Sequence, residues 1–233
     1  MDGPGPRPRV HVAFTPEEAV SAPVGVVVDV LRATSTIAQA LASGYRRVLC
    51  CADVDEARAL RESLGEGLLG GERSAVRIPG FDVGASPREF LQARAETLIL
   101  STTNGTRAVL AAAAACEEVL LGSLLNLDAV AAASRARRTD VAVVCAGFQG
   151  AFALDDAYCA GRIVELLPGA RTDAALAAEL VASSFPTALD GLNARTYGPP
   201  GLEEDIAWCA RENALDVVPR LARMVGTAAE ITA

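Results

Sequence analysis

The chain has 233 residues, of which 51% are apolar and 21% charged, and its formal net charge is −8. This length can bury a substantial core, no apolar run approaches a bilayer span, and the acidic balance argues against a nucleic-acid surface, which needs basic patches. All 21 basic residues are arginine and the only histidine is His11, which excludes lysine-dependent phosphate loops, pyridoxal Schiff bases and phosphatases that use paired histidines.

Residues 1–9 are rich in proline and glycine and lack the apolar centre of a signal peptide. We expect them to be a flexible lead-in to a cytoplasmic protein. Strand-like apolar runs follow at 10–14, 25–28, 47–51, 68–70, 98–100, 119–121 and 141–145. Helical patterns lie at 35–43, 53–62, 87–95, 106–115, 126–135, 155–167 and 173–183, and again at 203–211 and 216–225.

Most of the strand-like runs are continuous Val, Leu and Ile rather than alternating, which is typical of strands buried on both faces. Their alternation with helices predicts an α/β fold, a three-layer α/β/α sandwich with a largely parallel or mixed sheet. We expect one unit over 10–233, with subdomains of about 10–135 and 136–233 as the alternative. The segments 24–60 and 97–133 repeat one element order at an offset of about seventy residues, which suggests internal duplication.

Two loops carry small polar residues between a strand and a helix. One contains Thr102, Thr103, Asn104, Gly105 and Thr106, and the other contains Thr34, Ser35 and Thr36. Both place N–H and O–H donors at a helix N-terminus, where unpaired amides and the helix dipole favour an anion. The two loops predict a site for a phosphorylated or otherwise anionic small molecule.

Acidic residues beside these loops have two interpretations. Asp29 ends a strand, so it is either a Mg²⁺ ligand or nucleophile, or a helix-start acid paired with Arg32. Asp155 and Asp156 are either first-turn capping acids or ligands of a hard metal ion. Glu72, in a glycine-rich turn, is a third candidate ligand. An anion receptor gains nothing from these acids unless a metal is present, so they favour catalysis over simple binding.

Two other phosphatase patterns fail. The cysteine phosphatases need an arginine where this chain has Ala151, so Cys145 is better explained as a buried thiol, like the other five cysteines. The haloacid-dehalogenase phosphatases expect a second aspartate at the position of Leu31, and a lysine that this chain lacks.

The motifs together resemble the 2-phosphosulfolactate phosphatase family almost from end to end. They are residues 29–36, 70–73, 80–87, 101–106, 122–126, 145–147, 155–156, 160–161 and 205–210. Two departures are Ala85, where the family commonly has asparagine, and Asp155, where it commonly has glutamate.

The resemblance implies Mg²⁺-dependent hydrolysis of 2-phospho-3-sulfolactate, as in coenzyme M biosynthesis. It implies Asp29, Glu72, Asp155 and Asp156 as metal ligands, and Asp29, Arg32 and Asp156 as catalytic residues. The substrate contacts would include the hydroxyl loops together with Arg73, Ser86 and Asn126. Two alternatives stay open: a phosphatase of another small anionic phosphoester, and a non-catalytic protein that binds an anionic metabolite. The sequence does not determine the oligomeric state, although the alanine-rich helices suit a homodimer, and we expect neither nucleic acid nor membrane as a partner.

Overall fold

The structure is a computed structural model that describes residues 7–18 and 20–233. The predicted lead-in therefore lies mostly outside the described residues, and the first strand begins at Arg9. The strands are β1 (Arg9–Ala13), β2 (Ala22–Val28), β3 (Arg47–Cys50), β4 (Leu68–Arg73), β5 (Val76–Arg77), β6 (Thr97–Ser101), β7 (Cys116–Gly122), β8 (Val141–Cys145), β9 (Ala170–Arg171), β10 (Arg220–Val225) and β11 (Ala228–Thr232). The α-helices are α1 (Ala33–Ala42), α2 (Val54–Leu64), α3 (Gly105–Ala115), α4 (Leu127–Ala136), α5 (Leu154–Glu165), α6 (Asp173–Ser183), α7 (Ala188–Asn193) and α8 (Glu203–Cys209), with 3-10 turns at Pro87–Phe90 and Leu124–Asn126.

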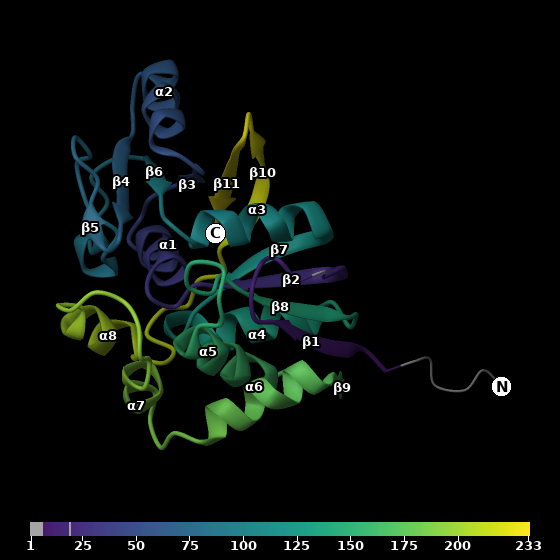
Figure 1. Ribbon diagram of the computed structural model, residues 1–233. Helices are drawn as coiled ribbons and strands as arrows, with labels where there is room; N and C mark the ends of the chain where they lie inside the picture. Colours follow the sequence, from purple (N-terminus) through teal and green to yellow (C-terminus); the bar gives the residue numbers. More distant parts are fainter. Residues whose placement is uncertain (1–6, 19) are drawn as a thin grey trace.

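All eleven of these strands form one mixed sheet, in the order β5-β4-β6-β3-β11-β10-β7-β2-β8-β1-β9. A parallel block of β4, β6 and β3 and a parallel block of β7, β2, β8, β1 and β9 are joined by the antiparallel hairpin β10–β11 (Figure 1). Because β2 pairs with both β7 and β8, residues on either side of position 135 share this sheet.

Helices cover both faces of the sheet, which confirms the predicted three-layer fold. Alternate residues of β2 show how the layers are held: Val26 and Val28 belong to a core with Ile163 of α5, whereas Val27 packs in a second core with Ile37 of α1. Strands that bury both faces in this way need continuous apolar sequence, as this one has.

The sheet register repeats within the chain. Arg47 pairs with Thr97 between β3 and β6, and the equivalent residues Val119 and Gly25 pair between β7 and β2. The unit β2-α1-β3-α2-β4 thus corresponds to β6-α3-β7-α4-β8. The first strand of each repeat lies among the strands of the other repeat, because β6 lies between β4 and β3 and β2 lies between β8 and β7. The predicted duplication is visible in topology and register.

Two predicted helices are wrong. Residues 216–225 contain the strand β10 instead, because the turn at Gly226 (φ 62°) lets β10 pair with β11 and fill the gap between β3 and β7. Residues 87–95 form only the turn Pro87–Phe90: Phe90 is buried near Tyr45, but residues 91–94 are exposed, so a longer helix would have no further apolar face to bury.

Among the described residues, none of the helices has both the length and the apolar character that a bilayer span requires. All six cysteines are free thiols; five are buried and Cys116 is half-buried, in agreement with the prediction.

Candidate active site

A cavity of about 290 Å³ lies where four strands end, two from each of the parallel blocks. Asp29 follows β2, Glu72 lies at the end of β4, Thr102 follows β6 and Phe148 follows β8, and all four line the cavity. Open α/β sheets bind ligands beyond the carboxyl ends of their strands, because helix N-termini and loop side chains gather there. The volume suits a small molecule.

Asp29 is held at the start of α1 by its own turn. Its carboxylate Oδ1 accepts a hydrogen bond from the Ala33 N–H at 3.1 Å, and its carbonyl accepts the Thr34 hydroxyl at 2.9 Å. In the described part of the chain, no group donates a hydrogen bond to Oδ2. No fully buried side-chain oxygen there is left without a partner, so Oδ2 is open to the cavity.

The N-terminus of α3 packs closely against the same carboxylate. A Cβ added at Gly105 would lie 2.3 Å from the Ala33 Cβ and 2.7 Å from Asp29 Oδ2. Atoms in a packed core do not approach this closely, so only glycine lets the two helix N-termini meet. This is the functional reason for Gly105, which does not itself line the cavity.

Replacing Gly105 by alanine should therefore push α3 away from Asp29 and lower activity by at least about tenfold, because small displacements of reacting groups are costly. The double variant Gly105→Ala/Ala33→Gly, which removes the methyl group that would clash, should recover part of the loss. Initial rates and melting temperatures of the three proteins test this. A single variant as active as the wild type would contradict it.

Asp155 and Asp156 play different parts. Asp155 lines the cavity, and its Oδ1 accepts hydrogen bonds from the Asp156 N–H and from the Tyr197 hydroxyl. Asp156 does not reach the cavity: its Oδ1 accepts the Val30 N–H at 2.9 Å and its Oδ2 the Gly147 N–H at 3.0 Å. Asp156 therefore links the loops after β2 and β8 and supports them. It does not lie where the predicted catalytic role and metal coordination would need it.

Glu72 joins two other loops. Its Oε1 accepts the Thr103 N–H and hydroxyl, both at 2.9 Å, and its Oε2 accepts the Ala75 N–H at 2.7 Å. The β4–β5 turn that it holds includes Ser74 (φ 53°) and Ala75 (φ 62°), and both line the cavity, as does Gln149 (φ 53°). These are three of the five non-glycine residues with positive φ among the described residues, and such conformations cluster at functional sites.

The cavity is electrostatically suited to a cation. Burial, followed by the charges of Asp155 and Glu72, raises the pKa of Asp29 to about 7, although the Ala33 N–H and Arg32 oppose the shift. Burial also raises the pKa of Asp155. Three carboxyl groups around one small space repel one another unless positive charge lies between them.

Within the described ranges, no three Asp, Glu, His or Cys side chains lie close enough together to form a metal site by themselves. The predicted four-carboxylate set is therefore not gathered, since Asp156 is turned away and both Glu72 oxygens are engaged. Mg²⁺ keeps several waters and is commonly held by one or two carboxylates plus substrate oxygens. The open Oδ2 atoms of Asp29 and Asp155 fit that requirement.

Most of the predicted hydroxyl contacts support the loops rather than face the cavity. Thr102, Thr103 and Asn104 line it. Thr34 binds the Asp29 backbone, the Ser35 hydroxyl donates to the Val30 carbonyl at 2.8 Å, and the Thr36 hydroxyl to the Ala85 carbonyl at 2.7 Å. Short hydroxyl side chains near a helix start readily satisfy local backbone groups.

Four further predicted contacts also lie outside the cavity lining. Thr106 contacts Thr102, and Arg73 donates to the Ser101 hydroxyl at 2.9 Å. The Ser86 hydroxyl donates to Asp205 Oδ1 at 2.5 Å. Asn126 completes a capping box with Ser123. Each of these side chains forms its hydrogen bonds with a neighbouring polar group of the protein and does not face the cavity.

The segment 195–202 supplies cavity residues that the sequence analysis missed. Arg195, Tyr197, Gly198, Pro199 and Leu202 line the cavity. Tyr197 stacks on Phe148 at 4.5 Å between ring centroids, and burial raises the pKa of its hydroxyl, so it stays a donor to Asp155. An arginine and a tyrosine directly before a Gly-Pro-Pro-Gly break were the available signal.

The fold and the site define an α/β protein with a small-molecule cavity in which arginines lie beside a cluster of carboxylates. A model of the family described as 2-phosphosulpholactate phosphatase matches residues 11–223. Relatives named probable 2-phosphosulfolactate phosphatase occur in Carboxydothermus hydrogenoformans (36% identical; 91% of this chain and 92% of the relative covered), Symbiobacterium thermophilum (38%; 89% and 95%) and Thermus thermophilus (37%; 94% and 97%). The chain belongs to the 2-phosphosulpholactate phosphatase family, whose members are phosphoric monoester hydrolases.

Proposed function

We propose that this protein hydrolyses 2-phospho-3-sulfolactate to 3-sulfolactate and inorganic phosphate in a Mg²⁺-dependent reaction. The observation that carries the proposal is the cavity itself: two helix N-termini, the guanidinium groups of Arg32 and Arg195, and three carboxylates surround one small space. The names of the relatives support the substrate. A substrate with three anionic groups needs these arginines and helix N-termini together with a metal ion, because the carboxylates and the protein as a whole are acidic.

Asp29 and Asp155 are the residues that would hold the metal, through the oxygen atoms that accept no hydrogen bond in the described structure. Bound Mg²⁺ would neutralise phosphate charge and lower the pKa of a coordinated water. Tyr197 donates to Asp155 Oδ1 and so fixes this carboxylate with Oδ2 free. Phe148 stacks on the Tyr197 ring and lines the cavity beside it.

The phosphoryl group would lie against the N-termini of α1 and α3, with the Thr102 side chain and Arg32 beside it. These donors meet the charge that grows on the phosphoryl oxygens as the ester P–O bond breaks. The position of Asp29 allows two routes. In one, its carboxylate attacks phosphorus and water then cleaves the aspartyl phosphate; in the other, it accepts a proton from the water that attacks.

Arg195 and Asn104 would contact the sulfonate or carboxylate end of the substrate. Arg195 donates one N–H to the Tyr197 carbonyl, at 2.6 Å, and the residue lines the cavity with its other N–H groups unused by this contact. A role in coenzyme M biosynthesis and the cytoplasmic location that goes with it belong to the same proposal, supported by the family. A homodimer is supported by the exposed Leu176 and Leu180 side chains of α6.

Phosphate release tests the proposal, with Mg²⁺ and with EDTA, on 2-phosphosulfolactate, phospholactate and phosphoglycerate. We expect rapid, Mg²⁺-dependent release that is selective for the sulfonate. Release from the other two esters alone would keep a phosphatase and overturn the substrate. Binding without release from any ester would favour a non-catalytic binding protein.

A further inference from the structure

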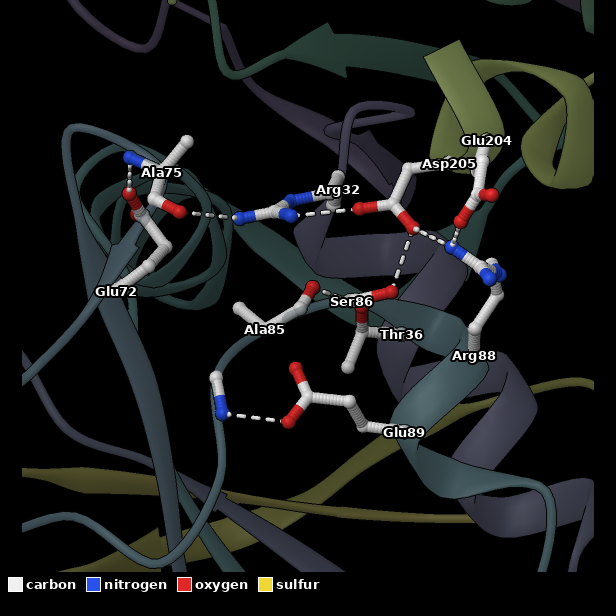
Figure 2. A network of polar contacts seen from close by, with 11 residues as sticks. Arg32, Thr36, Glu72, Ala75, Ala85, Ser86, Arg88, Glu89, Glu204 and Asp205 are labelled. Carbon is white, nitrogen blue, oxygen red and sulfur yellow. Dashed lines mark hydrogen bonds and ion pairs between the residues drawn. The ribbon is translucent and has the colours of Figure 1, made fainter. Parts of the chain in front are cut away.

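The guanidinium of Arg32 is held from two sides in the cavity wall. Its Nη1 donates to Asp205 Oδ2 at 2.6 Å, and its Nη2 donates to the Ala75 carbonyl at 3.4 Å. The side chains of Arg32 and Asp205 are only 9% and 7% exposed. Figure 2 shows this chain of contacts, which runs from Glu72 through Ala75 and Arg32 to Asp205.

Asp205 is itself fixed on its other oxygen. Its Oδ1 accepts the Ser86 hydroxyl at 2.5 Å and lies 3.9 Å from a nitrogen of Arg88, which also pairs with Glu204 (Figure 2). Asp205 lies in the first turn of α8, directly after the segment 195–202 that lines the cavity. One buried carboxylate therefore ties together α8, the start of α1 and the loop before the Pro87–Phe90 turn.

We propose that Asp205 is a positioning residue that fixes the Arg32 guanidinium toward the phosphoryl group, an inference that rests on the proposed function. Arginine loses much rotamer freedom when it is held in one place, so an arginine held before the substrate arrives binds an oxyanion at a smaller entropic cost. Asp205 takes one nitrogen of the fork, and Nε of Arg32 has no hydrogen-bond partner in the described part of the chain. The remaining N–H groups are left for two phosphoryl oxygens.

Charge supports the same assignment. A buried guanidinium without a counter-ion is costly, and a carboxylate on the far side from the ligand offsets that cost without adding negative charge inside the cavity. Asp205 does not line the cavity, whereas Arg32 does. Ser86 was predicted to contact the substrate, but its hydroxyl instead donates to Asp205 and orients that carboxylate.

A purely structural bridge between α8 and α1 predicts a different outcome from a positioning role. Losing such a bridge lowers stability and leaves kcat/KM of the folded protein unchanged. Losing a positioning contact lowers kcat/KM, weakens phosphate binding, and has both effects only while Arg32 is present. A double-mutant cycle of Asp205 and Arg32 distinguishes the two outcomes, because it isolates the coupling between the two residues.

The test compares Asp205→Asn, Arg32→Ala and the double variant, with Glu204→Gln as the matched control on the exposed side of α8. Asn keeps the size of Asp205 and its ability to accept a hydrogen bond, so the fold should survive. We expect Asp205→Asn to lower kcat/KM for phosphosulfolactate by about ten- to a hundredfold, as small displacements of a charged group do. Glu204→Gln should match the wild type, and Asp205→Asn should add nothing in the Arg32→Ala background.

Calorimetric titration with inorganic phosphate at fixed Mg²⁺ provides a second readout that does not depend on turnover. Affinity should fall with Asp205→Asn only where Arg32 is present. Equal losses in both backgrounds, or wild-type kinetics for Asp205→Asn, would overturn the positioning role. If the wild type binds phosphate but releases none from phosphosulfolactate, the proposed function fails and the titration still decides the role of Asp205. A wild type that does neither would overturn both.

Discussion

Replacing Asp29 by asparagine should lower the rate of phosphate release by at least about a hundredfold, the scale on which general bases and metal-bound nucleophiles contribute. Both routes open to Asp29 need its carboxylate, and asparagine keeps the shape and the acceptor for the Ala33 N–H. Steady-state kinetics over a Mg²⁺ series would measure the loss. Asp140→Asn is the matched control, because Asp140 binds the Arg9 N–H before β8, at the amino-terminal ends of the parallel strands.

Relative to the wild type, Asp29→Asn should become more stable as the pH rises. The pKa of Asp29 rises from 3.8 to about 7 on folding, so the folded state holds this proton more tightly and stability falls as the pH rises from about 4 to about 7. Asparagine has no proton to lose. In EDTA, Asp29→Asn should equal the wild type near pH 4 and exceed it at pH 8 by a few kcal/mol, on the order that the shift implies.

Urea denaturation at the two pH values would measure this difference. Loss of activity together with a gain of stability is the pattern expected where a carboxylate is kept for function at the expense of folding. An active Asp29→Asn enzyme would contradict a catalytic role. An inactive one with no gain at pH 8 would show that another group, such as Asp155, carries the proton.

Truncating Arg32 to alanine should also abolish most activity, by about 10²- to 10³-fold, the loss measured when one donor to a developing oxyanion is removed. Arg32→Lys restores the charge without the planar fork and should recover only part of the rate. If lysine restored full activity, the charge alone would matter, and the two-nitrogen contact with phosphate would be wrong.

Arg32→Ala should unfold more readily as well. It leaves Asp205 buried beside Ser86, with only the more distant nitrogen of Arg88 as a counter-charge. Breaking a buried pair in this way costs about 3–5 kcal/mol. The double variant Arg32→Ala/Asp205→Asn should be more stable than Arg32→Ala alone, because no unpaired charge remains. Thermal melts of the two proteins at one pH would show whether this holds.

Sequence was a good guide wherever one physical signal dominated. Apolar runs such as 141–145 predicted the buried strands, and the polar residues predicted near strand ends, such as Asp29 and Thr102, include seven of the nineteen that line the cavity. Strand β10 was missed because pairing with β7 and β11, rather than local propensity, determines it.

The rest of the site depends on which partner each polar group finds. Thr36 and Ser86 look as suitable for a phosphate as Thr102 does, yet their hydroxyls donate to a backbone carbonyl and to Asp205. Arg195 and Tyr197 reach the cavity from a segment far along the chain. Both facts are set by tertiary packing, and only the Gly-Pro-Pro-Gly break after Tyr197 marks the second one in the sequence.

The hairpin β10–β11 has a consequence for how the protein can be made. It separates β3 from β7 at the middle of the sheet, and it is translated after the other strands of the described residues. A nascent chain that lacks it therefore carries two open, apolar strand edges at its centre, and such edges invite pairing with other chains. Ribosome-bound intermediates that end before residue 220 should therefore require chaperone protection until the hairpin completes the sheet.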